Sequence, residues 1–171
     1  MKTSRILVVG SSNTDMIIKL DRIPRPGETI LGGAFVTAAG GKGANQAVGA
    51  ARAGGQVTFI ARVGQDMFGD QAVAGFVKDG INADHVTRDK TNPSGVALIF
   101  VANDGENSIA VAGGANAKLS PADVRKAKAA FAGASVLVMQ LETPLETVQA
   151  AADLAAKAGV RVILNPAPAQ Q

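Results

Sequence analysis

The sequence predicts an α/β fold with a mostly parallel central sheet and a small flap of extra strands. Short, continuous apolar runs alternate with helix-prone segments along most of the chain. Such runs are typical of strands that are buried on both faces of a parallel sheet. The alternation is interrupted twice by strand-like segments with no helix between them. We expect these interruptions to form an antiparallel flap beside the main sheet.

The first apolar run, residues 6–9, predicts a buried strand that ends at Gly10. Asn13 and Asp15 follow the end of this strand. Ligands of open α/β sheets bind outside the carboxyl ends of the strands, so both side chains stand where a polar ligand would be held. The alternative is that they only form an Asx turn.

The flap is predicted from strand-like segments in two parts of the chain. These segments are residues 16–20, 29–31, 34–37, 96–101 and 108–111. The last two flank an Asp-Gly step and predict a β-hairpin. We therefore expect a flap of about four strands, drawn from about residues 15–38 and 95–112.

Residues 39–47, which read Ala-Gly-Gly-Lys-Gly-Ala-Asn-Gln-Ala, indicate a cradle for a small molecule. Glycines allow a close approach of the backbone, and the start of a helix offers unpaired N–H groups. Lys42 and Asn45 can add side-chain hydrogen bonds. Gly43 stands where a phosphate-binding P-loop needs Ser or Thr, and Gln46 breaks the dinucleotide fingerprint. The alternative is a glycine-rich turn without a ligand.

The remaining elements continue the α/β alternation. We predict helices at residues 44–53, for about ten residues before Gly80, at 121–131 and up to 158, and strands at 57–63, 81–86, 135–139 and 160–164. Ser120 and Thr143, each followed by proline, predict the N-caps of two helices.

Glu142 follows the end of the strand at 135–139, as Asp15 follows the end of the first strand. Both carboxylates can therefore converge on one crevice with Asn13, Asn45 and the glycine backbone. Carboxylates and amides suit the hydroxyls of a polyol, because hydrogen bonds to charged groups are strong. Paired carboxylates can also hold a metal or act as acid and base, but the glycine cradle favours binding.

Composition limits the other functions. The 171 residues, 47% hydrophobic and 18% charged, predict one globular domain spanning 1–171. A net charge of +3, dispersed basic residues and no Trp or Tyr argue against nucleic acid. Without cysteine, thiolate metal sites are excluded, and we interpret the single His85 as a surface or structural residue rather than a catalytic base. No apolar run is long enough for a membrane span, so we expect a cytoplasmic protein.

Together these motifs resemble the ribokinase family of sugar kinases, in that family's order and over essentially the whole chain. The motifs are Asn13-x-Asp15, Pro26-Gly27-Glu28-Thr29, residues 40–47, Gly64-x-Asp66-x-x-Gly69, residues 95–99, Gly113-Gly114-Ala115-Asn116, Gln140-Leu141-Glu142 and Asn165-Pro166-Ala167-Pro168. The resemblance implies a Rossmann-like three-layer αβα fold in which the flap is a β-sheet lid. Ala44-Asn45-Gln46-Ala47 favours D-ribose as the substrate.

The resemblance also implies roles for single residues. The residues that would bind ribose hydroxyls are Asn13, Asp15, Gly41, Lys42, Asn45 and Glu142, while Ala97 and Val111 would line the apolar side of the sugar. It further implies a homodimer formed through the lid, and ATP, Mg²⁺ and a monovalent cation such as K⁺ as cofactors.

The sequence departs from the family pattern at its end. Family members continue for a second half that carries the catalytic base, the anion hole and most ATP contacts, and these motifs do not occur before Gln171. We therefore expect no catalytic residue in these residues and no activity from them alone. Two alternatives stay open: a relative that acts on another sugar, such as fructose, or on a nucleoside, and a sugar-binding module without catalysis.

Overall fold

In the computed structural model, which describes residues 4–169, five parallel strands form the central sheet in the order β5-β4-β1-β8-β9. The strands are β1 (Arg5–Val9), β4 (Gln56–Gly64), β5 (Asn82–Asp89), β8 (Val136–Met139) and β9 (Arg161–Leu164). All four pairings are parallel. The predicted parallel sheet is confirmed. Four of its strands coincide with apolar runs of the sequence, whereas β5 is largely polar and extends to Asp89, beyond the predicted 81–86.

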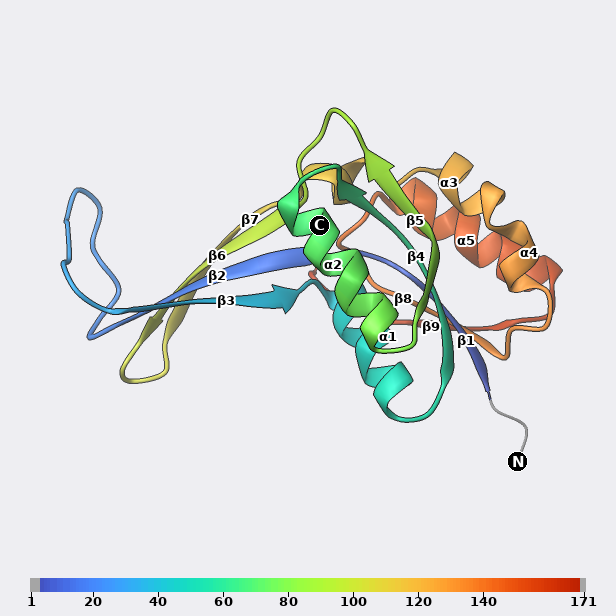
Figure 1. Cartoon of the computed structure of the whole chain (residues 1–171), viewed down its shortest axis with the longest axis horizontal. Helices are drawn as coiled ribbons and strands as arrows, with labels where there is room; N and C mark the ends of the chain where they lie inside the picture. The colour runs from blue at the N-terminus through green and yellow to red at the C-terminus, as the bar shows by residue number, and fades with distance from the viewer. Residues whose placement is uncertain (1–3, 170–171) are drawn as a thin grey trace.

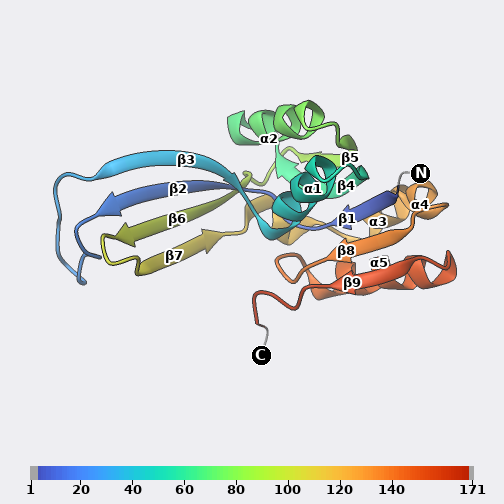
Figure 2. The same ribbon diagram turned by 90° about the horizontal axis from the view of Figure 1, so that it is seen from below.

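Helices cover both faces of this sheet and make three layers (Figure 2). They are α1 (Lys42–Arg52), α2 (Met67–Lys78), α3 (Pro121–Lys126), α4 (Lys128–Phe131) and α5 (Leu145–Lys157), with a short 3₁₀ helix η1 (Gly114–Lys118). None of the helices within residues 4–169 is long and apolar enough to cross a membrane.

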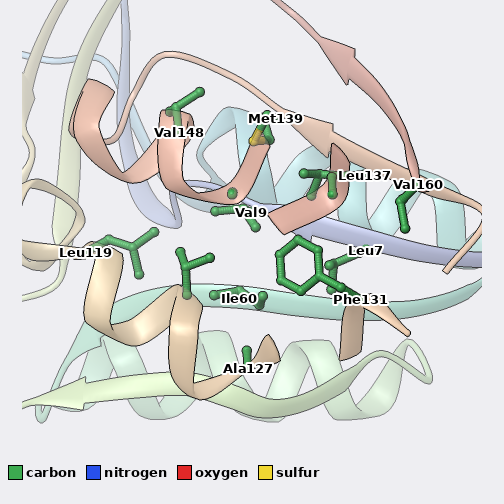
Figure 3. Packing of buried hydrophobic residues seen from close by; sticks show 13 residues of the cluster. Leu7, Val9, Ile60, Leu119, Ala127, Phe131, Leu137, Met139, Val148 and Val160 are labelled. Carbon is green, nitrogen blue, oxygen red and sulfur yellow. The ribbon is translucent and has the colours of Figure 1, made fainter. Parts of the chain in front are cut away.

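Alternate residues of the central strands supply two separate hydrophobic cores. Val8 and Phe59 pack with α1 and α2. Leu7 and Ile60 pack on the opposite face with α3, α4 and α5, where Phe131 fills the middle of the cluster (Figure 3). Because successive residues of a strand point to opposite faces, these continuous apolar runs require helices on both sides.

The lid is a separate sheet that projects away from the body (Figure 1). Its strands are β2 (Asn13–Leu20), β3 (Ala34–Gly40), β6 (Gly95–Ala102) and β7 (Asn107–Ala112), in the order β3-β2-β6-β7. The expectation of an antiparallel lid is wrong at its centre, where β2 and β6 run parallel. Both strands leave the body at the same end of the lid and therefore point in the same direction.

Three local predictions need correction. Residues 29–31 are not a strand; they belong to the loop before β3, where Gly32 and Gly33 adopt positive φ angles of 98° and 94°. The predicted helix at 121–131 is divided into α3 and α4 at Ala127. Thr143 is not an N-cap, because α5 begins at Leu145 after Pro144 without a side-chain cap.

Three short segments connect the body to the lid. Residues 10–12 lead into β2, residues 90–94 lead into β6, and residue 113 follows β7; we call these segments the hinge. Asp66, the N-cap of α2, accepts hydrogen bonds from the Ser94 N–H and hydroxyl, each at 2.7 Å. Asp89 accepts hydrogen bonds from the N–H groups of Thr91 and Asn92, each at 2.9 Å. These carboxylates fix the path by which β6 begins, and so the position of the base of the lid.

Candidate sugar site

Two glycines allow the start of α1 to lie against the hinge. Gly41, the N-cap of α1, has a φ of 91°, and a Cβ there would lie 2.8 Å from the Asn13 nitrogen. A Cβ on Gly43 would lie 2.5 Å from the Ser11 nitrogen. Only glycine fits such close approaches of backbone to backbone. The glycine stretch is therefore packed against the end of β1, where the sequence predicts a ligand crevice.

Glu142 joins the end of β8 to the start of α1. Its Oε2 accepts hydrogen bonds from the Ser11 hydroxyl at 2.5 Å and from the Lys42 N–H at 2.8 Å, and the Lys42 Nζ lies 3.1 Å from its Oε1. Burial alone would raise the pKa of Glu142, but the bonds from Ser11 and Lys42 together lower it below its ordinary value. Glu142 is thus held as a carboxylate at the positive end of α1.

Asp15 contrasts with Glu142, because no group in the described part of the chain donates a hydrogen bond to its carboxylate. The carboxylate lies over Gly40, where a Cβ would come within 2.2 Å of its Oδ1. Burial first, and then the charge of Glu142, raise the pKa of Asp15, while Lys42 opposes the shift. Asp15 therefore offers unused acceptor oxygens beside a backbone that has no side chain in the way.

The pairing of the lid strands aligns three of the predicted site residues in one row. Asp15 pairs with Ala97 across β2 and β6, and Ala97 pairs with Val111 across β6 and β7. Residues in register across a sheet share one face, so the two apolar side chains lie on the same side of the lid as the Asp15 carboxylate. Ala97 is buried, whereas 56% of Val111 is exposed.

A pocket of about 380 Å³ lies between the base of the lid, α1 and α2. Asn13, Gly40 and Asn45 line it. Its volume is within the usual range for small-molecule sites. Asp15, Lys42 and Glu142 do not line this pocket but stand next to it, since Asp15 lies over Gly40 and Lys42 begins α1. Of the eight predicted residues, only two therefore line the pocket, Asn13 and Asn45. Four stand beside it at the start of α1 and the base of the lid, Asp15, Gly41, Lys42 and Glu142, and two lie on the lid strands, Ala97 and Val111.

His85 does not line this crevice. It lines a second cavity, of about 410 Å³, with Arg5, Gln56 and Asn82, at the end of the sheet where β1 and β4 begin. Within residues 4–169, no group of three or more His, Asp or Glu side chains could hold a metal ion.

Sequence reasoning missed two residues that shape the site. Ser11 donates to Glu142, and Asn116 donates to the Asn13 side chain at 2.7 Å across 103 positions of sequence. Ser11 follows a strand end, as Asn13 and Asp15 do, which was a usable signal. The contact of Asn116 depends on the pairing of distant segments, which no local pattern reveals.

A pocket and several polar side chains lie at the carboxyl edge of a parallel sheet, at the base of a β-sheet lid, and this arrangement is that of a candidate small-molecule site in an α/β protein. Residues 3–171 match the model of the pfkB family carbohydrate kinases. The chain belongs to this family of carbohydrate kinases, and the resemblance seen in its motifs is confirmed.

Curated relatives and a solved structure agree with this membership. The chain is 47% identical over 165 residues to a ribokinase of Haemophilus influenzae, covering 96% of this chain and 54% of that protein. It is 42% identical over 164 residues to a deoxyribokinase of Salmonella typhi, with the same two coverages. The structure of Arabidopsis thaliana ribokinase complexed with ribose and ATP superimposes with a TM-score of 0.82 at 34% identity, covering 96% of this chain and 54% of that one. The chain thus spans about half the length of these relatives.

Proposed function

We propose that the complete protein transfers the γ-phosphoryl group of ATP to the 5-hydroxyl of D-ribose, and that residues 1–171 supply the sugar site and the lid. The observation that carries this proposal is the convergence of Asp15, Asn13 and the start of α1 on one crevice. A furanose carries several hydroxyl groups, and each needs both a donor and an acceptor. The unpaired Asp15 carboxylate supplies acceptors, and the amides of Asn13 and Asn45 supply donors.

Each predicted residue has a distinct task in this proposal. Asp15 accepts hydrogen bonds from sugar hydroxyls, and Glu142 holds Lys42 and the α1 start in place while exposing part of its own carboxylate. The backbone of Gly41 approaches the sugar closely because it carries no side chain. Ala97 and Val111 cover the apolar side of the sugar when the lid lies over it.

Phosphoryl transfer depends on positioning and on electrostatic stabilisation of the transferred group. In this proposal the residues described here perform the positioning: they bind the sugar, orient its 5-hydroxyl and exclude water under the lid. ATP with Mg²⁺ would supply the phosphoryl group, and a monovalent cation such as K⁺ would support it. We place the catalytic base and most nucleotide contacts in the part of the complete protein beyond Gln171, and we expect the enzyme in the cytoplasm.

The exposed strand β9 supports a continuation of the sheet. Val162, Ile163 and Leu164 are 38%, 51% and 45% exposed, although strands of a parallel sheet are usually covered on both faces. Relatives are about twice as long as this chain. We propose that the rest of the complete protein pairs with β9 and covers these side chains.

We also propose that a second copy of the protein covers the lid. The face that carries Ala97 and Val111 continues outward into Ile99, Ile109 and Val36 by register. Val36 and Ile109 are 48% and 54% exposed. Contiguous apolar side chains in an exposed sheet favour association, and pairing of two lids would remove them from water.

Deoxyribose is a second candidate substrate, favoured by the 42% identity to a deoxyribokinase. The two sugars differ by one hydroxyl, and a site built to bond a hydroxyl rejects the analogue without it by about 10⁴–10⁵. Assaying the complete protein with ribose, deoxyribose, fructose and adenosine separates the candidates. The proposal predicts the highest kcat/KM for ribose; a higher value for any of the others would replace ribose as the substrate.

A sugar-binding module without catalysis is the remaining alternative from a different class of protein. Reading the gene beyond codon 171 tests it. An in-frame continuation with a Gly-Ala-Gly-Asp segment supports the kinase. A stop codon at that point, together with ribose binding by residues 1–171, would support the module.

A further inference from the structure

We infer that Asn116 is a positioning residue that fixes which end of the Asn13 amide faces the pocket. Asn116 lies in η1, on the chain segment that returns from the lid, and Asn13 begins β2, on the segment that enters it. Asn116 and Asn13 are 2% and 7% exposed, and their side chains meet beside the hinge. Asn116 itself does not line the pocket, whereas Asn13 does.

The orientation of Asn116 is set by the backbone of Ser12. Its Oδ1 accepts the Ser12 N–H at 2.9 Å, and its Nδ2 donates to the Ser12 carbonyl at 3.0 Å. A backbone N–H can only donate and a carbonyl can only accept, so turning the Asn116 amide over would break both bonds. The assignment of oxygen and nitrogen in this side chain therefore follows from chemistry.

The orientation of Asn13 follows from that of Asn116. The Nδ2 of Asn116 also donates to the Asn13 Oδ1, at 2.7 Å. The atom of Asn13 that receives this bond must be its oxygen, because two amide nitrogens cannot share a hydrogen bond. The Nδ2 of Asn13, for which no acceptor exists among residues 4–169, is left for a ligand in the pocket.

Gly95 keeps the two amides in contact. A Cβ at Gly95 would lie 2.2 Å from the Asn13 Oδ1 and 2.3 Å from the Asn116 Nδ2. The first residue of β6 therefore closes over the hydrogen bond, and any side chain there would push the amides apart. The same contact links the amide pair to the strand on which Ala97 lies.

This orientation matters because the crevice is rich in acceptors. A sugar hydroxyl can donate one hydrogen bond and accept two through its lone pairs, and a carboxylate such as Asp15 accepts the one that it donates. The lone pairs then need donors, which the Asn13 Nδ2 supplies and its Oδ1 would not. This step rests on the proposed sugar-binding function; the orientation of the amides does not.

Hydrogen exchange of the side-chain amides tests the orientation without any sugar. In the complete protein with ¹⁵N-labelled asparagine, the Asn116 NH₂ should exchange slowly with water, and the Asn13 NH₂ should exchange at least tenfold faster. In Asn116→Asp, an acceptor replaces the donor, so the Asn13 amide should turn and its NH₂ should become protected. Glu106→Gln, in the exposed turn between β6 and β7, should leave the Asn13 rate unchanged. Equal protection of both amides in the wild type would overturn the inference.

A double-mutant cycle on ribose affinity tests the consequence. Asn116→Ala should weaken binding about tenfold in the wild-type background, as expected for one hydrogen bond. In the Asn13→Ala background, it should change affinity less than twofold. Equal losses in both backgrounds would mean that Asn116 only supports the fold, and would overturn its positioning role. If wild-type protein binds no ribose, the proposed function fails, and amide exchange alone decides the orientation.

Discussion

Lys42 and Glu142 are 100 positions apart in the sequence, yet the Lys42 N–H donates to Glu142 Oε2 at 2.8 Å and the Lys42 Nζ lies 3.1 Å from Oε1. The backbone and the side chain of one residue thus hold both oxygens of the carboxylate. This pair joins β8 to α1 and closes the crevice next to Asp15. It makes the first turn of α1 depend on the charge of a distant strand end.

Glu142→Gln should destabilise the complete protein by about 1–3 kcal/mol at pH 7, because the Lys42 ammonium loses a charged partner. The lowered pKa of Glu142 means that its contribution is present above the unfolded value of about 4.3 and is lost as pH falls through the folded pKa. Urea unfolding of the wild type and of Glu142→Gln at pH 7 and pH 4 measures how much stability the Glu142 carboxylate contributes at each pH. Glu106→Gln, in an exposed turn, should change stability by less than about 0.5 kcal/mol. Equal stability of wild type and Glu142→Gln at pH 7 would contradict the role of the pair.

Gly41→Ala should destabilise the protein by about 1–3 kcal/mol, since it places a Cβ at a φ of 91° and 2.8 Å from the Asn13 nitrogen. Gly49→Ala is the matched control, because Gly49 lies in the same helix with no atom within 4 Å of its Cβ position. This control should stabilise the protein by about 0.4–1 kcal/mol. Thermal unfolding of both variants gives the comparison. Two variants of equal stability would show that the glycine is not required for the approach.

Asp15→Asn should weaken ribose binding about 10- to 150-fold, the loss expected for a charge-assisted hydrogen bond. The same change should raise the stability of the sugar-free protein. Because the folded state raises the pKa of Asp15, this carboxyl contributes stability that is lost as pH rises through the folded pKa, and the amide has no such loss.

Calorimetry with ribose and unfolding without it measure the two effects of Asp15→Asn. Wild-type affinity should also fall as the pH drops through the raised pKa, and the pH dependence should be much smaller in the variant. A variant that binds ribose as tightly as the wild type would return Asp15 to the role of a turn residue.

Ile109→Lys should convert a dimer of the complete protein into a monomer, because it places a charge in the exposed apolar face of the lid. Ser108→Lys, on the next residue of the same strand, points to the opposite face and should leave the dimer intact. Light scattering during size-exclusion chromatography at about 10 µM protein decides between them. A wild type that is monomeric at this concentration, or an Ile109→Lys variant that is still dimeric, would contradict pairing through this face.

The sequence predicted the central sheet well because buried parallel strands are marked by local apolar runs. It failed where a local preference met a non-local constraint. Thr143 and Pro144 look like a helix start, but the Thr143 hydroxyl is buried without a hydrogen-bond partner and α5 begins later. Residues 29–31 have strand character, but they have no strand beside them.

The site was predicted as a set of residues but not as a geometry. Strand ends placed Asn13, Asp15 and Glu142 correctly at one edge of the sheet. The sequence did not predict that Glu142 is hydrogen-bonded within the protein while the Asp15 carboxylate is left without a donor. This difference depends on which carboxylate Ser11 and Lys42 contact in the fold. The same holds for Asn116, whose contact depends on how the two chain segments of the hinge pass each other.

Formation of ribose 5-phosphate tests the central claim most directly. The complete protein, incubated with D-ribose, ATP and Mg²⁺, should yield D-ribose 5-phosphate, identified by ³¹P and ¹³C NMR of the product. The Asp15→Ala variant should yield far less under the same conditions, and residues 1–171 alone should yield none. Failure of the complete, folded protein to phosphorylate ribose, or a phosphate on another carbon of the sugar, would contradict the account.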